Sequence, residues 1–388
     1  MATVEDPMTE LSMGILGRSA KENERRLPIH PTHFERIDRD LRERIWLEHG
    51  YGTTFGVRDE QLAPLVAGFA DHAELVERTD VLLLPKPTIT DVERMREGQV
   101  LWGWPHCVQD PVLTQAAVDR RLTLIAWEAM NHWDRDGHFV IHVFHLNNEL
   151  AGYASVLQAM SLRGMTGHYG RKRRAVLLGF GNTARGAATA LRSLGVTDIV
   201  ALTMREVHLV ADPVPGVTLG GLQRRSDIPG RTMTLKGTGP IPTEEYLAGF
   251  DIIVNCVLQD TDDPMMFLTD DDLAKLAPGT LIVDVSCDEA MGFSFARPTT
   301  FADPMFTIGD EVHYYAVDHS PSYLWESATW ENSEALIPHL RSVMSGDWSG
   351  NETIARAIEI RDGVIRNPKI LSFQHRSPDY PHRVSLEP

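Results

Sequence analysis

Short apolar runs alternate with longer helix-like stretches through the first 150 residues. The apolar runs are MGILG at 13–17, DVLLLPKP at 80–87, QVLWGWP at 99–105 and LTLIAWE at 122–128. After the first of them, PTHFERIDRDLRERIWLEHG at 31–50 has a helix-like pattern of apolar positions. Strands that alternate with helices predict an α/β layer built around a largely parallel sheet.

A second alternating series follows a predicted helix over 147–162. We interpret this helix, NNELAGYASVLQAMSL, as the connection between two domains; the basic stretch RGMTGHYGRKRR comes directly after it. The series then runs through AVLLGF at 175–180, DIVALTM at 198–204, FDIIVNCV at 250–257 and TLIVDVS at 280–286. Strands that are apolar on both faces are typical of a parallel sheet covered by helices on both sides.

The chain after Val317 is too short to fold alone, so we expect it to pack on the first domain. It begins with a predicted helix over 322–346 and ends in a polar tail. The sequence thus predicts an α/β protein in which two doubly wound Rossmann-like domains flank a cleft. The predicted domains are 1–150 plus 318–388, for substrate and catalysis, and 151–317, for the dinucleotide.

Charge and composition narrow the class of partner. The net charge of −17, from 37 basic and 54 acidic residues, argues against nucleic acid or an anionic membrane as the main partner. No apolar run reaches the roughly 18 residues of a transmembrane helix, and the acidic start MATVEDPMTELS does not resemble a signal peptide. Cys107, Cys256 and Cys287 are far apart and have no zinc-binding spacing. We expect reduced thiols, a cytoplasmic location and a composition compatible with a homodimer.

The stretch VLLGFGNTARGAA at 176–188 has the form of a dinucleotide-binding loop. An apolar strand leads into the first glycines, and a helix-like stretch follows them. Glycines permit the turn and the close approach of a pyrophosphate to the N–H groups of the helix N-terminus. A plain strand-to-helix turn is the alternative. Ala184 replaces the usual third glycine, and the predicted cofactor-binding residues of the loop are Gly179, Gly181, Asn182, Thr183, Ala184 and Gly186.

The end of the next predicted strand bears on the choice of cofactor. Domains that bind NAD place a carboxylate about 20 residues after the loop, whereas this chain has ALTMREV at 201–207. Thr203 has no charge to repel a 2′-phosphate, and Arg205 can pair with one. Glu206 would favour NAD(H) in a shifted register. The pattern favours NADP(H) over NAD(H).

Three motifs of the first domain resemble the alanine dehydrogenase, transhydrogenase and saccharopine dehydrogenase superfamily. They are KENERRLPIHP at 21–31, LPKP at 84–87 and QVLWGWPH at 99–106. NCVLQD, VDVSCD and AVDHSPSYLWESATWENSEALIPHL look like the lysine-forming saccharopine dehydrogenases. AGYASVLQA and GFGNTARGA look like the N5-(carboxyethyl)ornithine synthases, which are opine-type enzymes.

The resemblance implies roles for several residues of the first domain. Lys86 would contact the substrate and share in proton transfer, and His106 would be the general acid or base. Arg26 would hold a substrate carboxylate, with its neighbour Arg25 as the alternative. For Lys86, His106 and Arg26 the plain structural alternatives are a solvated lysine, a histidine at a strand end and a surface arginine.

The resemblance also assigns residues after the dinucleotide loop. Asp288 would lie in the cleft, where it would hold the nicotinamide ribose or balance Lys86; a helix N-cap is the alternative. His319 would reach the edge of the cleft. The turn expected along the nicotinamide ring consists of Asn255, Cys256, Val257 and Leu258. Cys256 and Cys287 are expected to be small buried residues rather than nucleophiles.

Three other groups of residues resemble catalytic or metal-binding sites, but the sequence argues against each of them. Cys107 beside His106 suggests a Cys–His nucleophile, but hydride transfer accounts for more of the chain. The histidines of GHFVIHVFHLN, at 138, 142 and 145, would face one another only on a helix, whereas this stretch is β-prone and offers no accompanying carboxylate. Asp318, His319 and Ser320 are adjacent, so they are not expected to form a triad. No metal is therefore expected.

The function predicted from the sequence is a reductive condensation of an amino acid amine with a 2-oxo acid, driven by NAD(P)H. One alternative is reductive amination with ammonia, as in alanine dehydrogenase. Another is a catalytically silent nucleotide-binding protein, against which the joint presence of Lys86, His106 and Arg26 argues.

Overall fold

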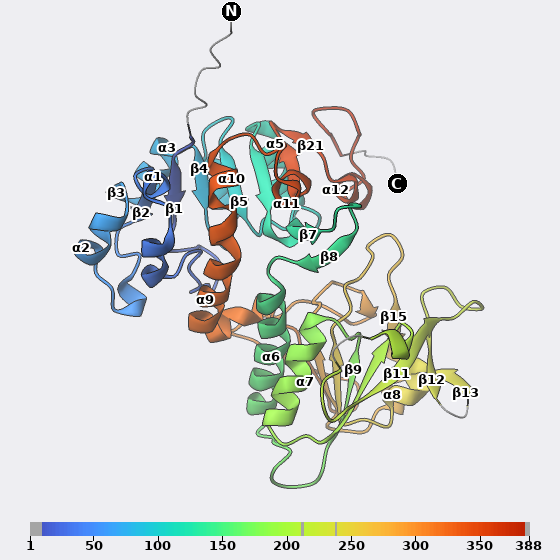
Figure 1. The fold of residues 1–388 in the computed structure, drawn as a ribbon. Helices are drawn as coiled ribbons and strands as arrows, with labels where there is room; N and C mark the ends of the chain where they lie inside the picture. The colour runs from blue at the N-terminus through green and yellow to red at the C-terminus, as the bar shows by residue number, and fades with distance from the viewer. Residues whose placement is uncertain (1–9, 211–212, 237–238, 385–388) are drawn as a thin grey trace, which may run out of the picture. The chain divides into compact units, whose positions relative to one another are not determined.

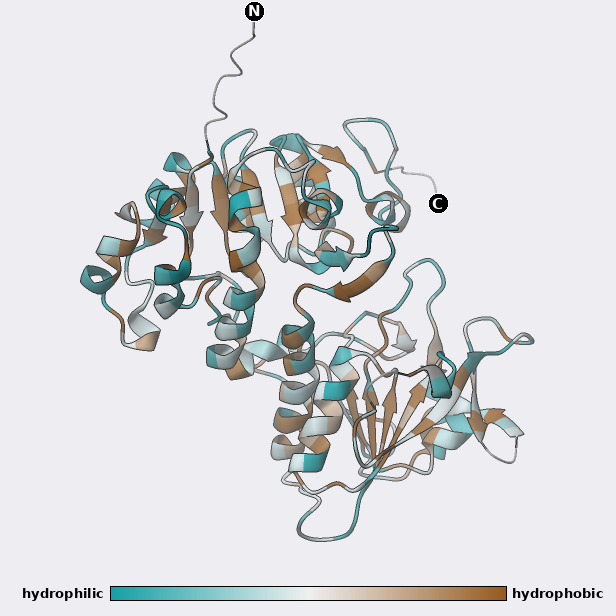
Figure 2. Cartoon of the chain, viewed as in Figure 1, coloured by the Kyte–Doolittle hydropathy of each residue, from teal (hydrophilic) through white to brown (hydrophobic). Residues whose placement is uncertain are grey.

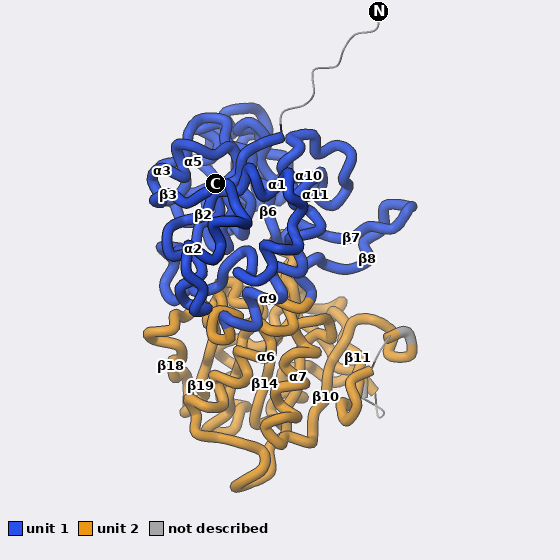
Figure 3. Tube along the Cα trace, turned by 60° about the vertical axis from the view of Figure 1, so that its left-hand side comes forward, with its two compact units in different colours: residues 1–145, 325–388 blue, residues 146–324 orange. Residues whose placement is uncertain are grey.

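The computed structural model describes residues 10–210, 213–236 and 239–384, and the chain divides into two compact units. The first unit comprises residues 1–145 and 325–388, and the second comprises 146–324 (Figure 3). The second unit begins five residues before the predicted boundary at 151 and ends seven residues after the predicted boundary at 317. The long helix α6 (His145–Leu162) begins earlier than predicted, and Ser320 Oγ donates to the carbonyl of Ala151 within the second unit.

The first unit contains an eight-stranded sheet of order β21-β20-β6-β5-β4-β1-β2-β3 (Figure 1). Its strands are β1 (Met13–Ile15), β2 (Ile45–Glu48), β3 (Gly68–Ala70), β4 (Val81–Leu83), β5 (Val100–Gly103), β6 (Thr123–Ala126), β20 (Ile358–Arg361) and β21 (Val364–Ile365). The six strands from β6 to β3 are parallel, and β20 and β21 add an antiparallel edge. A separate hairpin pairs β7 (Asn131–Trp133) with β8 (Phe139–His142).

Short helices surround this sheet. The α-helices of the unit are α1 (Arg39–Arg42), α2 (Asp59–Leu62), α3 (His72–Arg78), α4 (Ile89–Arg94), α5 (Pro111–Asp119), α9 (Trp325–Leu336), α10 (Leu340–Met344), α11 (Glu352–Arg356) and α12 (Pro368–Phe373). The 3-10 helices are η1 (Pro31–Arg36), η2 (Thr53–Phe55), η3 (Ala63–Leu65), η4 (Trp127–Ala129) and η8 (Ile337–His339). The C-terminal segment therefore contributes both helices and an edge of the sheet to this unit.

The second unit contains a nine-stranded sheet of order β13-β12-β11-β10-β9-β14-β16-β19-β18. Its strands are β9 (Arg174–Leu178), β10 (Asp198–Thr203), β11 (Val217–Arg224), β12 (Thr232–Lys236), β13 (Gly239–Pro242), β14 (Ile252–Asn255), β16 (Leu281–Asp284), β18 (Met305–Ile308) and β19 (Val312–Tyr315). The six strands from β11 to β19 are parallel, with antiparallel pairs at both edges. The small strands β15 (Met266–Leu268) and β17 (Gly292–Phe293) pair separately.

The central strands of both sheets are strongly hydrophobic (Figure 2). In the second unit, α6 packs on α7 (Asn182–Ser193), and glycines allow the close approach: a Cβ at Gly152 would lie 1.9 Å from the carbonyl oxygen of Thr183 (Figure 1). The remaining helices there are α8 (Thr243–Leu247), η5 (Val207–Leu209), η6 (Asp270–Lys275) and η7 (Ser320–Leu324). Among the described residues, we find no helix with the length and apolar character needed to cross a membrane.

The α/β prediction with two doubly wound layers is confirmed, but two helix predictions are wrong in detail. The stretch 31–50 is not a continuous helical pattern, because its apolar IWLE run forms strand β2 beside β1. The predicted helix over 322–346 is divided into η7, α9, η8 and α10. Pro338 lies at the second of these breaks, where its ring and missing N–H prevent a regular helix from continuing.

Candidate functional site

In the first unit, four chemically active side chains follow four neighbouring strands at the same edge of the sheet. Strands β1, β4, β5 and β6 are parallel, and the chain order reverses between β1 and β4. Ligands of doubly wound sheets bind at the carboxyl ends of the strands around such a reversal. The residues that follow these four strands are Arg18, Lys86, His106 and Glu128.

Lys86 and His106 are brought into direct contact. Nζ of Lys86 lies 2.6 Å from Nε2 of His106. Lys86 is half-buried, and 43% of the His106 side chain is exposed to solvent. A hydrogen bond of this kind needs one donor hydrogen and one lone pair, so at least one of the two nitrogens is unprotonated on the bonded side. The arrangement therefore suits an exchange of protons with a bound substrate.

The backbone of His106 is held in a rare conformation. Its φ of +47° lies in the left-handed region, which a residue with a Cβ adopts at a cost of about 1–3 kcal/mol. The N–H of His106 donates to Oε1 of Glu128 at 2.7 Å, and its carbonyl accepts from the N–H groups of Gln109 and Asp110. These bonds maintain the turn that directs the imidazole toward Lys86.

Glu128 is a part of the site that the sequence analysis missed. Besides the His106 N–H, Oε1 lies 3.9 Å from Nδ1 of the same histidine. Burial, together with the nearby carboxylate of Glu359, raises the pKa of Glu128. The only signal in the sequence was its position as the last residue of the run LTLIAWE, at the end of a strand predicted to lie in the same sheet.

Arg26, the predicted carboxylate clamp, is buried and engaged by a neighbouring acid. Its guanidinium donates from Nε to Glu24 Oε1 at 2.8 Å and from Nη2 to Glu24 Oε2 at 2.5 Å, and it lies over the ring of Trp104. One bidentate edge of the guanidinium is thus occupied by Glu24. Arg25, the alternative clamp, is exposed.

Arg18 is a second arginine at this edge, and it was also missed. Its guanidinium bonds Oε1 of Glu48 from Nε at 2.9 Å and from Nη2 at 2.7 Å. Glu48 is buried, with 3% of its side chain exposed, whereas 74% of the Arg18 side chain is exposed. The next residue, Ser19, donates from Oγ to the carbonyl of Lys86 at 2.6 Å, which ties this loop to the strand end that bears the lysine.

In the second unit, the glycine loop connects β9 to α7 at the position expected for a pyrophosphate. Chain order reverses between β9 and β14, so the loop lies at the switch point of this sheet. Gly179 has a φ of +88°, and a Cβ there would lie 3.2 Å from the carbonyl oxygen of Cys256. A Cβ at Gly181 would meet nothing within 4 Å, so that side of the helix N-terminus is open.

The remaining loop residues divide between binding and packing. Asn182 and Thr183 form the first turn of α7, whose N-cap residue is Gly181 and has no side chain to occupy the turn's N–H groups. Ala184 is fully buried. Gly186 lies against α6, because a Cβ there would be 1.8 Å from the carbonyl oxygen of Glu149. The open N-terminus of α7 fits a dinucleotide pyrophosphate.

The end of β10 presents a cation rather than a carboxylate. Thr203 is buried and accepts from the N–H of Arg205 at 3.2 Å. The guanidinium of Arg205 donates to the carbonyl of Phe180 in the glycine loop at 2.5 Å, and Arg185 lies over the Phe180 ring. Glu206 is exposed and pairs with His208 at 3.3 Å.

Behind the predicted nicotinamide turn lies a buried carboxyl group that the sequence analysis missed. Asp284, fully buried, accepts from Asn255 Nδ2 at 3.0 Å and from the Tyr314 hydroxyl at 2.5 Å. It also accepts from the N–H groups of Ser286 and Cys287. Burial raises the pKa of Asp284 to about 6. The carboxyl group thereby fixes the ends of β14 and β16 against each other.

The four residues of that turn differ in their surroundings. Asn255 is fully buried, and its Oδ1 accepts from the N–H of Val257 at 3.2 Å. The carbonyl of Val257 accepts from Ser286 Oγ at 2.6 Å. Cys256 is only partly buried, contrary to prediction, although burial raises the pKa of its thiol. Leu258 is 92% exposed.

Asp288 and His319 both lie in the second unit. Asp288 follows β16 in the turn after Cys287, and burial raises its pKa to about 6. His319 is buried against the ring of Phe301 and bonds Asp318 through Nδ1. Adjacent side chains do therefore meet here, contrary to expectation. Ser320 takes no part, because its hydroxyl donates to the carbonyl of Ala151.

The alternative nucleophile and the histidine cluster do not assemble. Cys107 is fully buried, and burial raises the pKa of its thiol well above the ordinary value, which disfavours a thiolate. His142 faces the carbonyl of Trp127 from β8, and His145 begins α6. The three histidines thus lie on different elements.

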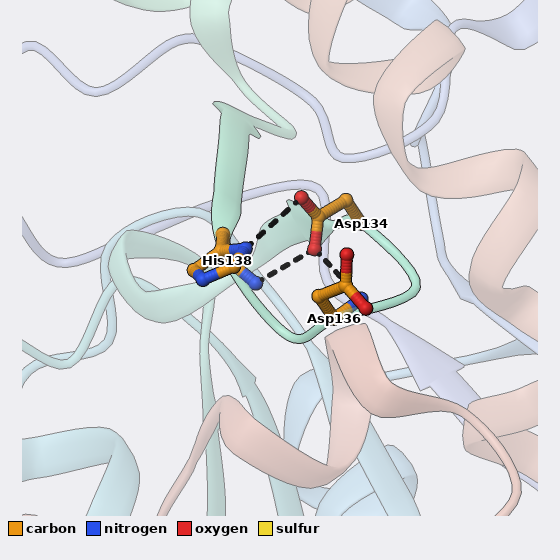
Figure 4. A group of neighbouring side chains, drawn as sticks. All are labelled: Asp134, Asp136 and His138. Atoms are coloured by element: carbon orange, nitrogen blue, oxygen red, sulfur yellow. Dashed lines mark hydrogen bonds and ion pairs between the residues drawn. The ribbon is translucent and has the colours of Figure 1, made fainter.

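His138 does have carboxylates beside it, so that expectation is wrong (Figure 4). Asp134, Asp136 and His138 present ligand atoms within 4.8 Å of one another, and all three are exposed. Asp134 accepts from the N–H groups of Asp136 and His138, both at 2.9 Å. These bonds close the turn between β7 and β8, which accounts for the cluster without a metal.

Two family models match the chain: "Alanine dehydrogenase/PNT, N-terminal domain" over 16–148 and "Alanine dehydrogenase/PNT, C-terminal domain" over 219–368. The glycine loop and the segment after 368 lie outside both matched ranges. An alanine dehydrogenase of Mycobacterium tuberculosis is 22% identical over 90% of this chain and 93% of its own length. An N(5)-(carboxyethyl)ornithine synthase of Clostridium botulinum is 24% identical over 82% and 91%.

Solved structures share the fold. An L-alanine dehydrogenase superposes with a TM-score of 0.71 at 17% identity, covering 93% of this chain and 98% of that one. A transhydrogenase from Sinorhizobium meliloti gives a TM-score of 0.66 at 18% identity, covering 92% and 99%. At such identities the likeness concerns architecture alone.

Proposed function

The chain belongs to the alanine dehydrogenase/PNT family of NAD(P)-dependent oxidoreductases, and from that premise we propose that it condenses an amino acid amine with a 2-oxo acid reductively. The observation that carries the proposal is the contact of Lys86 with His106 at the carboxyl edge of the first sheet. The overall reaction consumes one reduced cofactor and one proton, and it releases water and a secondary amine.

The Lys86–His106 pair supplies the proton transfers. When the amine attacks the carbonyl carbon, the carbonyl oxygen must gain a proton to form the carbinolamine, and it must gain a second to leave as water. The amine nitrogen loses protons in the same steps. Two nitrogens 2.6 Å apart can pass a proton between them and so serve both needs. Glu128 maintains the orientation of His106 through the backbone N–H.

Arg18 and Arg26 account for the two carboxylates that a condensation brings together. The 2-oxo acid and the amino acid each have one carboxylate, whereas ammonia has none. Both arginines belong to the first unit, at the edge that bears the proton-transfer pair, and each is oriented by its own glutamate, Glu48 or Glu24. Planar guanidinium groups suit carboxylates. Two such groups favour condensation over simple amination.

The second unit would hold the cofactor. Gly179, Gly181 and the first turn of α7 would bind its pyrophosphate, and the turn from Asn255 to Leu258 would border its nicotinamide. When bound, the nicotinamide supplies the hydride that reduces the imine. Arg205 and the uncharged Thr203 would accommodate a 2′-phosphate, which favours NADP(H). Asp288 is proposed as a further catalytic residue, and His319 as a further substrate-binding residue.

Reductive amination with ammonia is the second candidate, because alanine dehydrogenases predominate among the relatives that match. An amino acid with a ¹⁵N-labelled α-amine, unlabelled ammonia, a 2-oxo acid and the reduced cofactor would be incubated together with the protein, and the product analysed by mass spectrometry. A secondary amine that contains the label and both carbon skeletons supports condensation. A primary amino acid formed from the oxo acid and ammonia, with the labelled amino acid unconsumed, supports the second candidate.

A further inference from the structure

The loop that bears His106 is held by a segment at the other end of the chain. After the left-handed His106, the carbonyls of Cys107 and Val108 point toward the C-terminal segment. Nε2 of Gln374 donates to the Cys107 carbonyl at 2.6 Å and to the Val108 carbonyl at 3.1 Å. An amide nitrogen has two hydrogens, so both donors of Gln374 are used on this loop.

Arg376 fixes the orientation of that amide. Its Nε donates to Oε1 of Gln374 at 2.5 Å, so the amide oxygen faces Arg376 and the amide nitrogen faces the loop. The same guanidinium donates to the carbonyl of Pro111 at 3.0 Å and to Oε1 of Gln115 at 2.6 Å. These last two partners belong to α5, which directly follows the His106 loop.

This clamp is buried and belongs to the body of the first unit. Gln374 is 8% exposed and Arg376 is 6% exposed. Ile370 on α12, which precedes them, is fully buried in the same apolar cluster as Cys107. A buried charge costs several kcal/mol unless it is well hydrogen-bonded, so Arg376 remains stable there only while its partners on α5 and Gln374 are in place.

The clamp lies beyond the part of the chain that the family model describes, since that match ends at residue 368. We infer that Gln374, oriented by Arg376, is a positioning residue that holds the His106 backbone in its left-handed turn and thereby maintains the Lys86–His106 contact. The inference rests on the proposed role of His106. It assigns to the C-terminal segment a part in the reaction that the family likeness does not supply.

The sharpest test is Gln374→Glu in the full chain. Glutamate has nearly the same shape and still pairs with Arg376, but it presents oxygens instead of hydrogens to the two carbonyls. Gln374→Met, which removes the donors without adding a charge, is the second variant in case the first does not fold. Asn351→Ala is the matched control, because the Asn351 side chain lies in the same unit but bonds the N–H of Ile354 on α11 and the Ser342 hydroxyl instead of the His106 loop.

The readout is the side-chain nitrogen signal of His106 in protein labelled at histidine, assigned by its loss in His106→Gln and followed through a pH titration. We expect the titration midpoint to shift in Gln374→Glu and Gln374→Met and to stay at the wild-type value in Asn351→Ala. We expect kcat to fall on the order of 10-fold in the Gln374 variants, with unchanged Kd for the reduced cofactor.

A lowered Tm in the Gln374 variants, with the His106 midpoint at its wild-type value, would overturn the inference and leave the clamp a purely structural contact. Because the signal is measured without substrate, this failure is distinct from a failure of the proposed function. The latter would appear as unchanged turnover in His106→Ala.

Discussion

The amine of Lys86 lies 2.6 Å from Nε2 of His106, and the two residues follow the adjacent parallel strands β4 and β5. A hydrogen bond between these nitrogens needs a lone pair on one of them, so Lys86 and His106 are not both protonated while the bond is present. Adjacent parallel strands bring their carboxyl ends side by side, which is how residues 20 positions apart meet. The proposed chemistry depends on this contact.

Removing either member of the pair should abolish most of the turnover. We expect His106→Ala and Lys86→Met to lower kcat about 100- to 10,000-fold, because each removes one member of the proposed proton-transfer pair. The Kd for the reduced cofactor, measured by fluorescence titration, should be unchanged, because the glycine loop belongs to the other unit. Turnover at the wild-type level in either variant would remove the assigned role.

Arg18 should matter for substrate affinity and not for cofactor affinity. Loss of a charge-assisted hydrogen bond to a carboxylate costs about 1.5–3 kcal/mol, so Arg18→Met should raise KM for one of the two substrates about 10- to 100-fold. The matched control is Arg39→Met, since Arg39 is another largely exposed arginine, on α1, and pairs with Glu43. If both variants had the same KM as the wild type, Arg18 would be only a surface residue.

Arg205 should set the preference between the two cofactors. Arg205→Met should weaken NADPH binding about 10- to 100-fold, because it removes the cation proposed to bind the 2′-phosphate, and should leave NADH binding almost unchanged. Arg192→Met provides a control at the far end of α7, at an exposed position. Equal losses for NADPH and NADH in Arg205→Met would show that the residue supports the glycine loop through Phe180 instead.

Asp284 should make the stability of the second unit depend on pH. Burial raises its pKa from 3.8 to about 6, so the folded state binds a proton more tightly than the unfolded state. The stability from this group is therefore present at low pH and is lost as pH rises from about 4 through 6, by up to about 3 kcal/mol.

Urea denaturation of the wild type and Asp284→Asn across this range isolates the contribution of the carboxyl group. The free energy of unfolding of the wild type should fall relative to that of Asp284→Asn as pH rises. If the difference between the two free energies of unfolding stayed constant with pH, or grew in favour of the wild type, the raised pKa of Asp284 would be contradicted.

Much of the architecture could be predicted because the buried strands are short apolar runs that periodicity reveals. Lys86 and His106 could be located because each follows such a run, and parallel strands deliver their carboxyl ends to one edge. The strand IWLE escaped because it lies inside a stretch whose charged residues repeat at helical spacing. Whether an arginine binds substrate could not be predicted, because it depends on the glutamate that orients it.

The acids that organise the site could not be predicted from sequence. Glu48 and Glu128 accept from backbone N–H groups of distant loops. Asp284 accepts from the side chains of Asn255 and Tyr314, which belong to other strands. Such pairings leave no pattern in the nearby sequence. An acid at a strand end cannot be distinguished from any other until the fold brings its hydrogen-bond donors to it. The Gln374 clamp is separated from its partner Cys107 by 267 residues and is subject to the same limit.

The central claim is tested most directly by following cofactor oxidation with 2-oxo acids crossed against amines. Pyruvate, glyoxylate and 2-oxoglutarate would each be combined with ammonia, lysine, ornithine and other amino acids, with NADPH and NADH in parallel. The account predicts turnover only where a 2-oxo acid and a second amino acid are both present, and faster turnover with NADPH. Full turnover with ammonia alone would contradict it and assign the protein to reductive amination.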